Sequence, residues 1–170
     1  MAESHEILRV LALLGGAFPN FELREETGEV YCRLLADLPA PLLEAATLRH
    51  IATAKFFPTV AELREAAWAM SGQLPPEPME AWGEVMRQMR VNGAPSGPRF
   101  SHPAIREVVE QMTWWALCFS DNPPAERARF LEAYEKVGRR QRDYFLVPEE
   151  VRQLTSGDLR PQLAERADLQ

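Results

Sequence analysis

Apolar residues along this chain recur every three or four positions, and no stretch of useful length alternates as a β-strand would. This spacing places an apolar stripe on each of several helices. In the first 71 residues the stripes predict helices at about 4–16, 23–36, 40–54 and 60–71. Farther along they predict helices at about 79–91, at about 101–117 and from about 123 into the low 140s. We therefore expect an all-α protein.

A proline-rich stretch at residues 72–78 separates the two helical groups, with three prolines in four consecutive positions. Prolines at this density favour an extended, semi-rigid spacer. Beyond Pro148 the chain becomes polar, as flexible tails do. The expected organisation is a small N-terminal helical bundle at 1–71, a Pro-rich linker at 72–78, a C-terminal helical region at 79–147 and a mostly flexible tail at 148–170.

Two aromatic residues and a proline lead into the helix predicted at 60–71. Pro58 pushes Phe56 and Phe57 toward extended geometry, so the chain turns a corner here. Thr59 and Glu62 have the spacing of a capping box, in which each side chain accepts a hydrogen bond from the backbone N–H of the other. We favour a structural role for this elbow, with one or both aromatic side chains in the core. The alternative is an exposed aromatic pair that docks a protein partner.

Composition narrows the function classes. The 170 residues carry a formal net charge of −6, which disfavours strong sequence-independent DNA binding, because phosphate contacts need clustered Lys and Arg. The two cysteines make no disulfide framework, and the three histidines lack metal-ligand spacing. With no phosphate-binding loop and no nucleophile–base pair in the sequence, we expect no enzyme, no cofactor and no metal. No apolar run has the form of a membrane span or signal peptide, so we expect a cytoplasmic protein without a membrane partner.

The densest basic cluster lies near the end of the last long helix, at Lys136, Arg139, Arg140 and Arg142. Cations there complement the negative end of the helix dipole, and this structural role is the interpretation we favour. The functional alternative is a contact with an acidic partner or with nucleic acid. Arginine and aromatic residues often anchor interfaces, so the candidate partner-binding residues also include the apolar residues that follow: Tyr144, Phe145 and Leu146.

Trp114 and Trp115 are neighbours on the helix predicted at about 101–117. Successive side chains on a helix diverge by about 100°, so the two indoles cannot face the same core. Either one is partly exposed and available to a partner, or both are buried between packed helices.

Several segments resemble the phage replicative-helicase loader and inhibitor family, whose members load a DnaB-type hexameric helicase. The segments are residues 13–14, 17–21, 34–39, 45–46 and, above all, 51–63, which contain the aromatic-Pro-Thr-x-x-Glu elbow. The pattern spans roughly residues 5–70. The resemblance implies an all-helical N-terminal domain, a flexible C-terminal part that contacts the helicase, and no catalytic residues.

The second half resembles the C-terminal region of related phage replication proteins, through residues 80–85, 108–115, 117–120 and 127–134. In such relatives a glycine often precedes the tryptophan that corresponds to Trp114, whereas this chain has Thr113. Residues 79–145 also differ from a flexible C-terminal part, because they have the pattern of a folded helical region.

The expected function is therefore a phage DNA-replication adaptor that binds, loads and restrains the replicative helicase in the host cytoplasm. A loader must bind one helicase state more tightly than another, since equal affinity for both shifts nothing. Other replication initiator proteins are further candidate partners, and we expect direct DNA binding to be weak or absent.

Two alternatives remain open from the sequence. One is a DNA-binding origin or regulatory protein that uses residues 139–142 and the helix pair at 40–54 and 60–71. The second helix of that pair disfavours it, because its first turns offer DNA the mixed set Glu62, Arg64 and Glu65. The other alternative is a non-enzymatic phage assembly protein.

Overall fold

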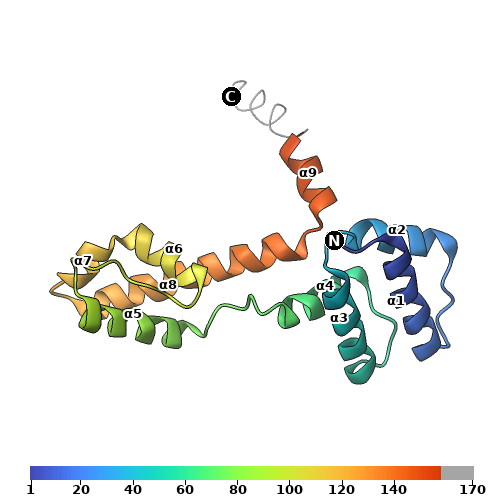
Figure 1. The fold of residues 1–170 in the computed structure, drawn as a ribbon, viewed down its shortest axis with the longest axis horizontal. Helices are drawn as coiled ribbons and strands as arrows, with labels where there is room; N and C mark the ends of the chain where they lie inside the picture. The colour runs from blue at the N-terminus through green and yellow to red at the C-terminus, as the bar shows by residue number, and fades with distance from the viewer. Residues whose placement is uncertain (158–170) are drawn as a thin grey trace, which may run out of the picture. The chain divides into compact units, whose positions relative to one another are not determined.

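The computed structural model describes residues 1–157, and within them the chain forms helices joined by turns and loops, with no strand (Figure 1). The nine helices of this described part are α1 Ser4–Ala17, α2 Glu25–Leu35, α3 Ala40–Thr53, α4 Val60–Met70, α5 Pro78–Asn92, α6 Pro103–Met112, α7 Trp114–Cys118, α8 Pro123–Leu146 and α9 Glu149–Gly157. The predicted all-α fold class is confirmed. No helix among these residues is both long and apolar enough to cross a membrane.

The chain divides into two compact units. Unit 1 combines residues 1–73 with the C-terminal residues from Tyr144 onward, and unit 2 is Leu74–Asp143. Unit 1 is thus discontinuous in sequence, and helix α8 contributes residues to both units. That residues 1–71 and 79–147 fold as independent domains stays a prediction.

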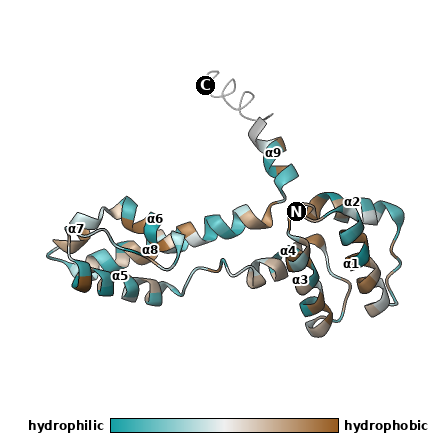
Figure 2. Ribbon diagram, viewed as in Figure 1, coloured by the Kyte–Doolittle hydropathy of each residue, from teal (hydrophilic) through white to brown (hydrophobic). Residues whose placement is uncertain are grey.

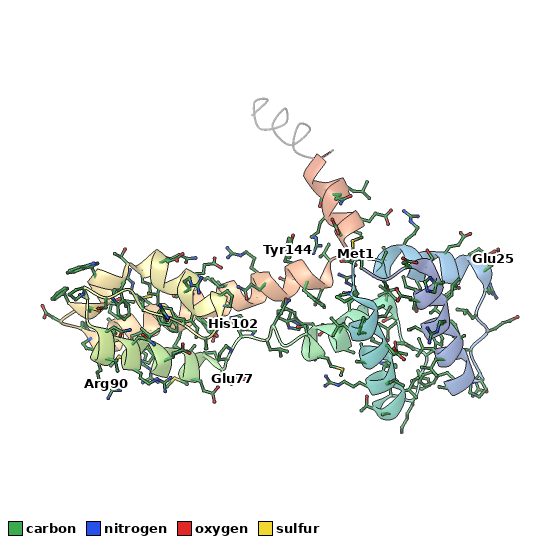
Figure 3. All side chains as sticks on the ribbon, viewed as in Figure 1. Met1, Glu25, Glu77, Arg90, His102 and Tyr144 are labelled. Carbon is green, nitrogen blue, oxygen red and sulfur yellow. The ribbon has the colours of Figure 1, made fainter. Side chains whose placement is uncertain are left out.

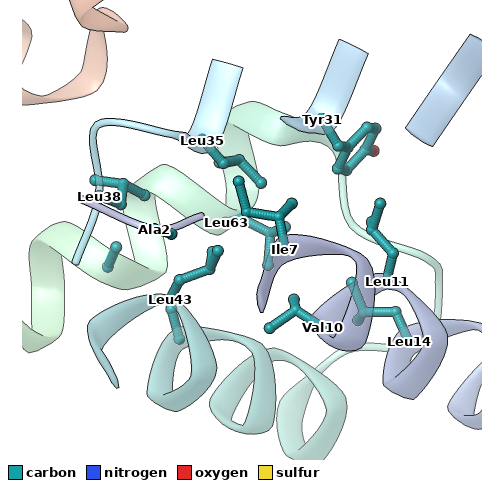
Figure 4. Packing of buried hydrophobic residues seen from close by; sticks show 12 residues of the cluster. Ala2, Ile7, Val10, Leu11, Leu14, Tyr31, Leu35, Leu38, Leu43 and Leu63 are labelled. Atoms are coloured by element: carbon teal, nitrogen blue, oxygen red, sulfur yellow. The ribbon is translucent and has the colours of Figure 1, made fainter. Parts of the chain in front are cut away.

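Unit 1 is built on helices α1 to α4, which we call the N-terminal bundle. Their apolar stripes face the shared core of Figure 4, whose largest fully buried aliphatic side chains are Ile7, Leu11, Leu14, Leu35, Leu43 and Leu63. Tyr31 packs beside them, and its hydroxyl donates a hydrogen bond to the Pro58 carbonyl at 2.6 Å. Burial of each large aliphatic side chain is worth about 1.5–3 kcal/mol, so this core is the main stabilising feature of the bundle.

The elbow before α4 has the predicted capping box. The Glu62 N–H donates to Thr59 Oγ1 at 3.2 Å, and the Thr59 N–H donates to Glu62 Oε2 at 2.7 Å. These bonds satisfy backbone donors that the first turn of a helix leaves without intrahelical partners. The hydrogen bonds from the Thr59 N–H and hydroxyl also hold the pKa of the Glu62 carboxyl below its usual value. Helix α4 therefore begins at Val60, as predicted.

Unit 2 packs α5, α6 and α7 against residues 123–143 of α8. Its buried core draws on all four helices and includes Trp82, Val85, Ile105, Val108, Leu117 and Phe130. Glu77 and Arg90, labelled in Figure 3, lie at the two ends of α5. Helix α8 is mostly hydrophilic (teal in Figure 2), so it offers the core only a narrow apolar stripe. The Tyr134 hydroxyl on that stripe donates to the Pro76 carbonyl at 2.9 Å, which holds the proline-rich stretch against α8.

The single helix expected at about 101–117 is two helices in the structure. Helix α6 ends at Met112 and α7 begins at Trp114, because Thr113 has a φ of 68° and a ψ of 115°. A β-branched residue rarely adopts a positive φ, whereas glycine does so without steric cost. The expectation of one continuous helix is therefore wrong. The break was not predicted because threonine gives no sequence signal for this backbone conformation.

Helix α9 occupies part of the stretch where the sequence predicts a mostly flexible tail, 148–170. Its sequence is polar overall, and contacts with the rest of unit 1 hold its beginning. The Glu149 N–H donates to Asp37 at 3.2 Å, and Arg33 of α2 pairs with Glu150. The remainder of the expected tail, 158–170, lies outside the described residues.

Candidate partner-binding site

The predicted partner-binding residues all lie on α8, but they belong to different units. Four exposed basic residues are in unit 2: Lys136, Arg139, Arg140 and Arg142. The three apolar and aromatic residues are in unit 1: Tyr144, Phe145 and Leu146. The basic part and the aromatic part of the predicted cluster therefore have different surroundings.

Acidic neighbours neutralise much of the basic part. Lys136 Nζ lies 2.6 Å from Glu132 Oε1, one turn earlier on α8, and Arg140 pairs with Glu107 of α6. The hydrogen bond and the charge of Lys136 hold the pKa of the Glu132 carboxyl below its usual value. Arg139 is exposed and makes no ion pair within residues 1–157. Of these residues, Arg139 thus keeps the most charge available to a partner.

A polar groove of about 340 Å³ lies beside this part of α8. Residues of α6 and α8 line it: Gln111, Arg129, Glu132, Ala133, Lys136, Val137 and Arg140. Each of its three basic side chains has an acidic partner: Arg129 pairs with Glu126, Lys136 with Glu132 and Arg140 with Glu107. The groove is therefore polar and close to charge-balanced.

The aromatic part lies at the end of α8. Tyr144, labelled in Figure 3, is 66% exposed, and the Arg152 guanidinium carbon lies 4.1 Å from the centre of its ring. Phe145 is half-buried against Trp68 of α4, with ring centres 5.1 Å apart. Leu146 is half-buried as well. Of the three predicted residues, Tyr144 is the one with an accessible side chain, while Phe145 packs onto the N-terminal bundle.

Arg64 of α4 is a central residue of unit 1 that sequence reasoning missed, and it is only 1% exposed. A guanidinium has five N–H donors, and here each has an acceptor. Nη1 and Nη2 donate to the two carboxylate oxygens of Asp37 at 2.6 and 2.9 Å, and Nη1 also donates to the Leu34 carbonyl at 2.9 Å. Nε and Nη2 donate to the carbonyls of Leu146 and Phe145, at 2.7 and 2.6 Å. Because the last carbonyls of a helix lack intrahelical partners, Arg64 caps the ends of both α2 and α8.

Asp37 extends this network to α9. Its Oδ2 accepts from the Glu149 N–H at 3.2 Å, and Arg152 Nη2 lies 3.8 Å from the same oxygen. Burial acts to raise the pKa of the Asp37 carboxyl, but the hydrogen bonds and charge of Arg64, together with the Glu149 N–H, outweigh burial and hold the pKa below its usual value. Asp37 is therefore ionised at neutral pH, and the Arg64–Asp37 pair joins α2, α4, α8 and α9.

The position of Arg64 on its helix is the sequence signal that could have identified it. Ala67 and Trp68 are buried on the same face of α4, three and four residues later. An arginine within such a stripe is seldom fully buried unless it is paired, so its presence indicates a buried counter-ion. We expected Glu62, Arg64 and Glu65 to lie together on the surface of this helix. That expectation is wrong for Arg64, whose side chain is buried, while Glu62 and Glu65 are exposed.

The two aromatic residues of the elbow lie in different environments. Phe57 packs against the core, stacked on Phe21 with ring centres 3.8 Å apart and edge-on to Tyr31 at 6.0 Å. Phe56 is 81% exposed. Of the two interpretations of this pair, core packing describes Phe57, and Phe56 is the side chain left available to a partner.

Trp114 and Trp115 also lie in different environments. Trp114 is half-buried, and its indole N–H donates to the Gly93 carbonyl at 3.2 Å. Trp115 is 55% exposed and stacks on Phe119, which is 68% exposed, with ring centres 5.5 Å apart. Helix α7 and its C-cap residue Phe119 therefore present an exposed aromatic pair on the surface of unit 2.

Reactive groups are not gathered in the described part of the chain. Within residues 1–157 no group of three or more His, Cys, Asp or Glu side chains is placed to hold a metal ion. Cys32 and Cys118 are half-buried, and burial raises the pKa of both thiols, which disfavours the reactive thiolate. The groups that the structure does assemble suit packing and protein recognition.

The N-terminal bundle has a counterpart among known protein families. Residues 3–64 match the family described as G39P, N-terminal domain. G39P is the helicase loader and inhibitor of phage SPP1. The resemblance to the phage helicase-loader family is thereby confirmed for this part of the chain. No curated protein and no solved structure matches the chain.

The G39P match ends at Arg64, so it includes the elbow and both members of the Arg64–Asp37 pair. It includes no residue of unit 2 and none of the C-terminal residues from Tyr144 onward. The family therefore describes the N-terminal bundle, while the predicted partner-binding residues of α8 lie outside the matched segment.

Proposed function

We propose that this chain is a phage replication adaptor without catalytic activity of its own. It binds a DnaB-type replicative helicase, delivers the helicase to DNA and restrains its ATPase until release. The observation that carries the proposal is the match of residues 3–64 to the N-terminal domain of a phage helicase loader and inhibitor.

The contact surface that we propose lies on α8 within unit 2. Arg139 is exposed and has no ion pair among residues 1–157, and Lys136 and Arg140 border the groove on the same helix. Such a surface speeds encounter with an acidic patch and helps to set its orientation. Tyr144 of unit 1 is a separate exposed residue of a type that often anchors interfaces.

Delivery and restraint both follow from differential affinity. An adaptor that binds the loading-competent state of the helicase more tightly shifts the helicase toward that state, by no more than the difference between its two affinities. The adaptor must bind the helicase state that follows loading with lower affinity, so that it can dissociate. The adaptor therefore needs no catalytic group, only a surface that fits one state better.

Direct DNA binding is not part of the proposal. Lys136 and Arg140 are already paired with Glu132 and Glu107, so a phosphate would have to compete with a carboxylate at each. The formal net charge of −6 also opposes approach to a phosphate backbone.

The test is removal of charge from this face, in the double variant Arg139→Ala with Arg140→Ala. A matched control is Arg87→Ala with Arg106→Ala, which removes two exposed cations from α5 and α6 of the same unit. Binding to the purified DnaB-type helicase of the phage or its host is measured at low and moderate salt, beside a DNA mobility shift at physiological salt. We expect the α8 variant to bind the helicase more weakly, with a flatter salt dependence and unchanged stability, and the control to bind normally.

Three results would speak against parts of this proposal. Unchanged helicase binding of the α8 variant at both salts would exclude the proposed surface. Absence of helicase binding by the unmodified protein would exclude the function. DNA binding by the unmodified protein that the α8 variant loses would favour a DNA-binding origin or regulatory protein instead.

A further inference from the structure

The C-terminal arm, residues 144–157, is held to the N-terminal bundle mainly by polar contacts. Its apolar contact with the bundle is Phe145 on Trp68. Four large apolar or aromatic side chains of the arm are exposed instead: Tyr144, Val147, Val151 and Leu154. The arm is therefore docked by the packing of Phe145 and by the hydrogen bonds to Arg64 and Asp37.

The bundle keeps its buried arginine paired without the arm. Three of the five Arg64 N–H donors are satisfied inside the bundle, two by Asp37 and one by Leu34. The other two donate to the arm carbonyls of Phe145 and Leu146, where water can replace them. No described side chain of the arm is fully buried, so its departure leaves the core of α1 to α4 closed.

We propose that undocking of the arm from Arg64 and Asp37 is a separate conformational step, and that the helicase binds the undocked form. The docked arm half-buries Phe145 against the core of the bundle. The undocked arm offers the Phe145 side chain as an apolar anchor for an interface. Docking is then autoinhibitory, and its strength sets how much protein is ready to bind. This inference rests on the proposed function, because the helicase is the partner.

The size of the effect follows from population arithmetic. When the binding-competent form is a minor fraction, the apparent dissociation constant is the intrinsic one divided by that fraction. A change that makes the undocked form ten times more populated therefore tightens apparent binding up to about tenfold. It does so without adding any contact to the partner.

The informative variant is Glu149→Pro, because it acts on the arm alone. Proline removes the N–H that Glu149 donates to Asp37, and proline is tolerated at the first position of a helix. Glu149→Ala is the matched control, since it removes the same carboxylate but keeps the N–H. Asp37→Asn is a second variant, which weakens the pair from the bundle side.

The first measurement is amide hydrogen exchange of the full chain, which needs no partner. We expect Glu149→Pro to speed exchange in residues 150–155 about tenfold relative to Glu149→Ala, the factor for loss of a hydrogen bond to a charged group. Exchange in α1 and α3 should stay within about twofold, because their core is untouched. Equal acceleration in the arm and the bundle, or none in the arm, would overturn the separate step.

The second measurement is binding of the same variants to the purified DnaB-type helicase. We expect Glu149→Pro to bind the helicase more tightly than Glu149→Ala does. The ratio of the two dissociation constants should be no larger than the ratio of the exchange rates measured in the arm. Weaker or unchanged binding with faster arm exchange would overturn autoinhibition. If neither the unmodified protein nor any variant binds, the proposed function fails, while the exchange data still decide whether the arm undocks separately.

Discussion

Replacing Thr113 by glycine should stabilise unit 2, although most substitutions at the end of a helix destabilise a protein. Thr113 separates α6 from α7 with a φ of 68° and a ψ of 115°. The branched Cβ of threonine is crowded at this positive φ, whereas glycine has no Cβ and tolerates a positive φ better. The residue is exposed, so its replacement removes no buried contact.

The magnitude is a difference between two opposing effects. A residue held in a sparsely populated φ/ψ region costs about 1–3 kcal/mol. Glycine removes that cost but increases the conformational entropy of the unfolded chain, which costs about 0.4–1 kcal/mol. We expect Thr113→Gly to raise the free energy of unfolding of unit 2 by about 1 kcal/mol.

The assay is urea unfolding followed by tryptophan emission. Three of the four tryptophans report on unit 2: Trp82, Trp114 and Trp115. The control is Ala128→Gly, at an exposed position inside α8 with ordinary helical geometry. There glycine should lower the free energy of unfolding by about 1 kcal/mol. Should Thr113→Gly destabilise the protein as much as Ala128→Gly does, Thr113 would not be strained and the reasoning would be refuted.

Two further predictions concern unit 1. Thr59→Ala removes the acceptor of the Glu62 N–H, so thermal unfolding should show a free energy of unfolding lower by about 1 kcal/mol. The helicase affinity per folded molecule should not change. Lost binding with unchanged stability would make the elbow a docking site. Because the Asp37 pKa is lowered in the folded protein, its contribution is fully present above the unfolded value near 3.8 and is lost as the pH falls toward the folded value. Hydrogen exchange in residues 150–155 should therefore accelerate as the pH is lowered below about 4, after correction for intrinsic rates, and Asp37→Asn should remove most of that dependence.

Local sequence chemistry predicts much of this fold. The elbow is the best example, since Pro58, Thr59 and Glu62 act within one turn of each other and place the start of α4 at Val60. The break at Thr113 escapes prediction because it depends on how α6 and α7 pack, and the residue type does not indicate it. Helix α9 escapes for a related reason: its own sequence is polar, and its beginning is held by contacts with Asp37 and the α2 surface.

At the candidate site, charge and aromatic content are visible in the sequence, whereas the pairing of the charges is not. Lys136 and Arg140 stand out as cations, yet Arg140 has its counter-ion on α6, 33 residues away in the chain. Arg64 is the stronger case: its carboxylate partner is 27 residues away, and its arm acceptors, Phe145 and Leu146, are 81 and 82 residues away. Only the folded chain brings these groups together.

The long separation between Arg64 and its last acceptors has a consequence for synthesis. A ribosome adds about 5–20 residues per second, so Leu146 is made roughly 4–16 s after Arg64. All of unit 2 is translated in that interval, between the two segments of unit 1. A nascent N-terminal bundle that folds within this interval has Arg64 bonded to Asp37, Leu34 and water alone. The whole of unit 2 has the opportunity to fold before unit 1 is complete.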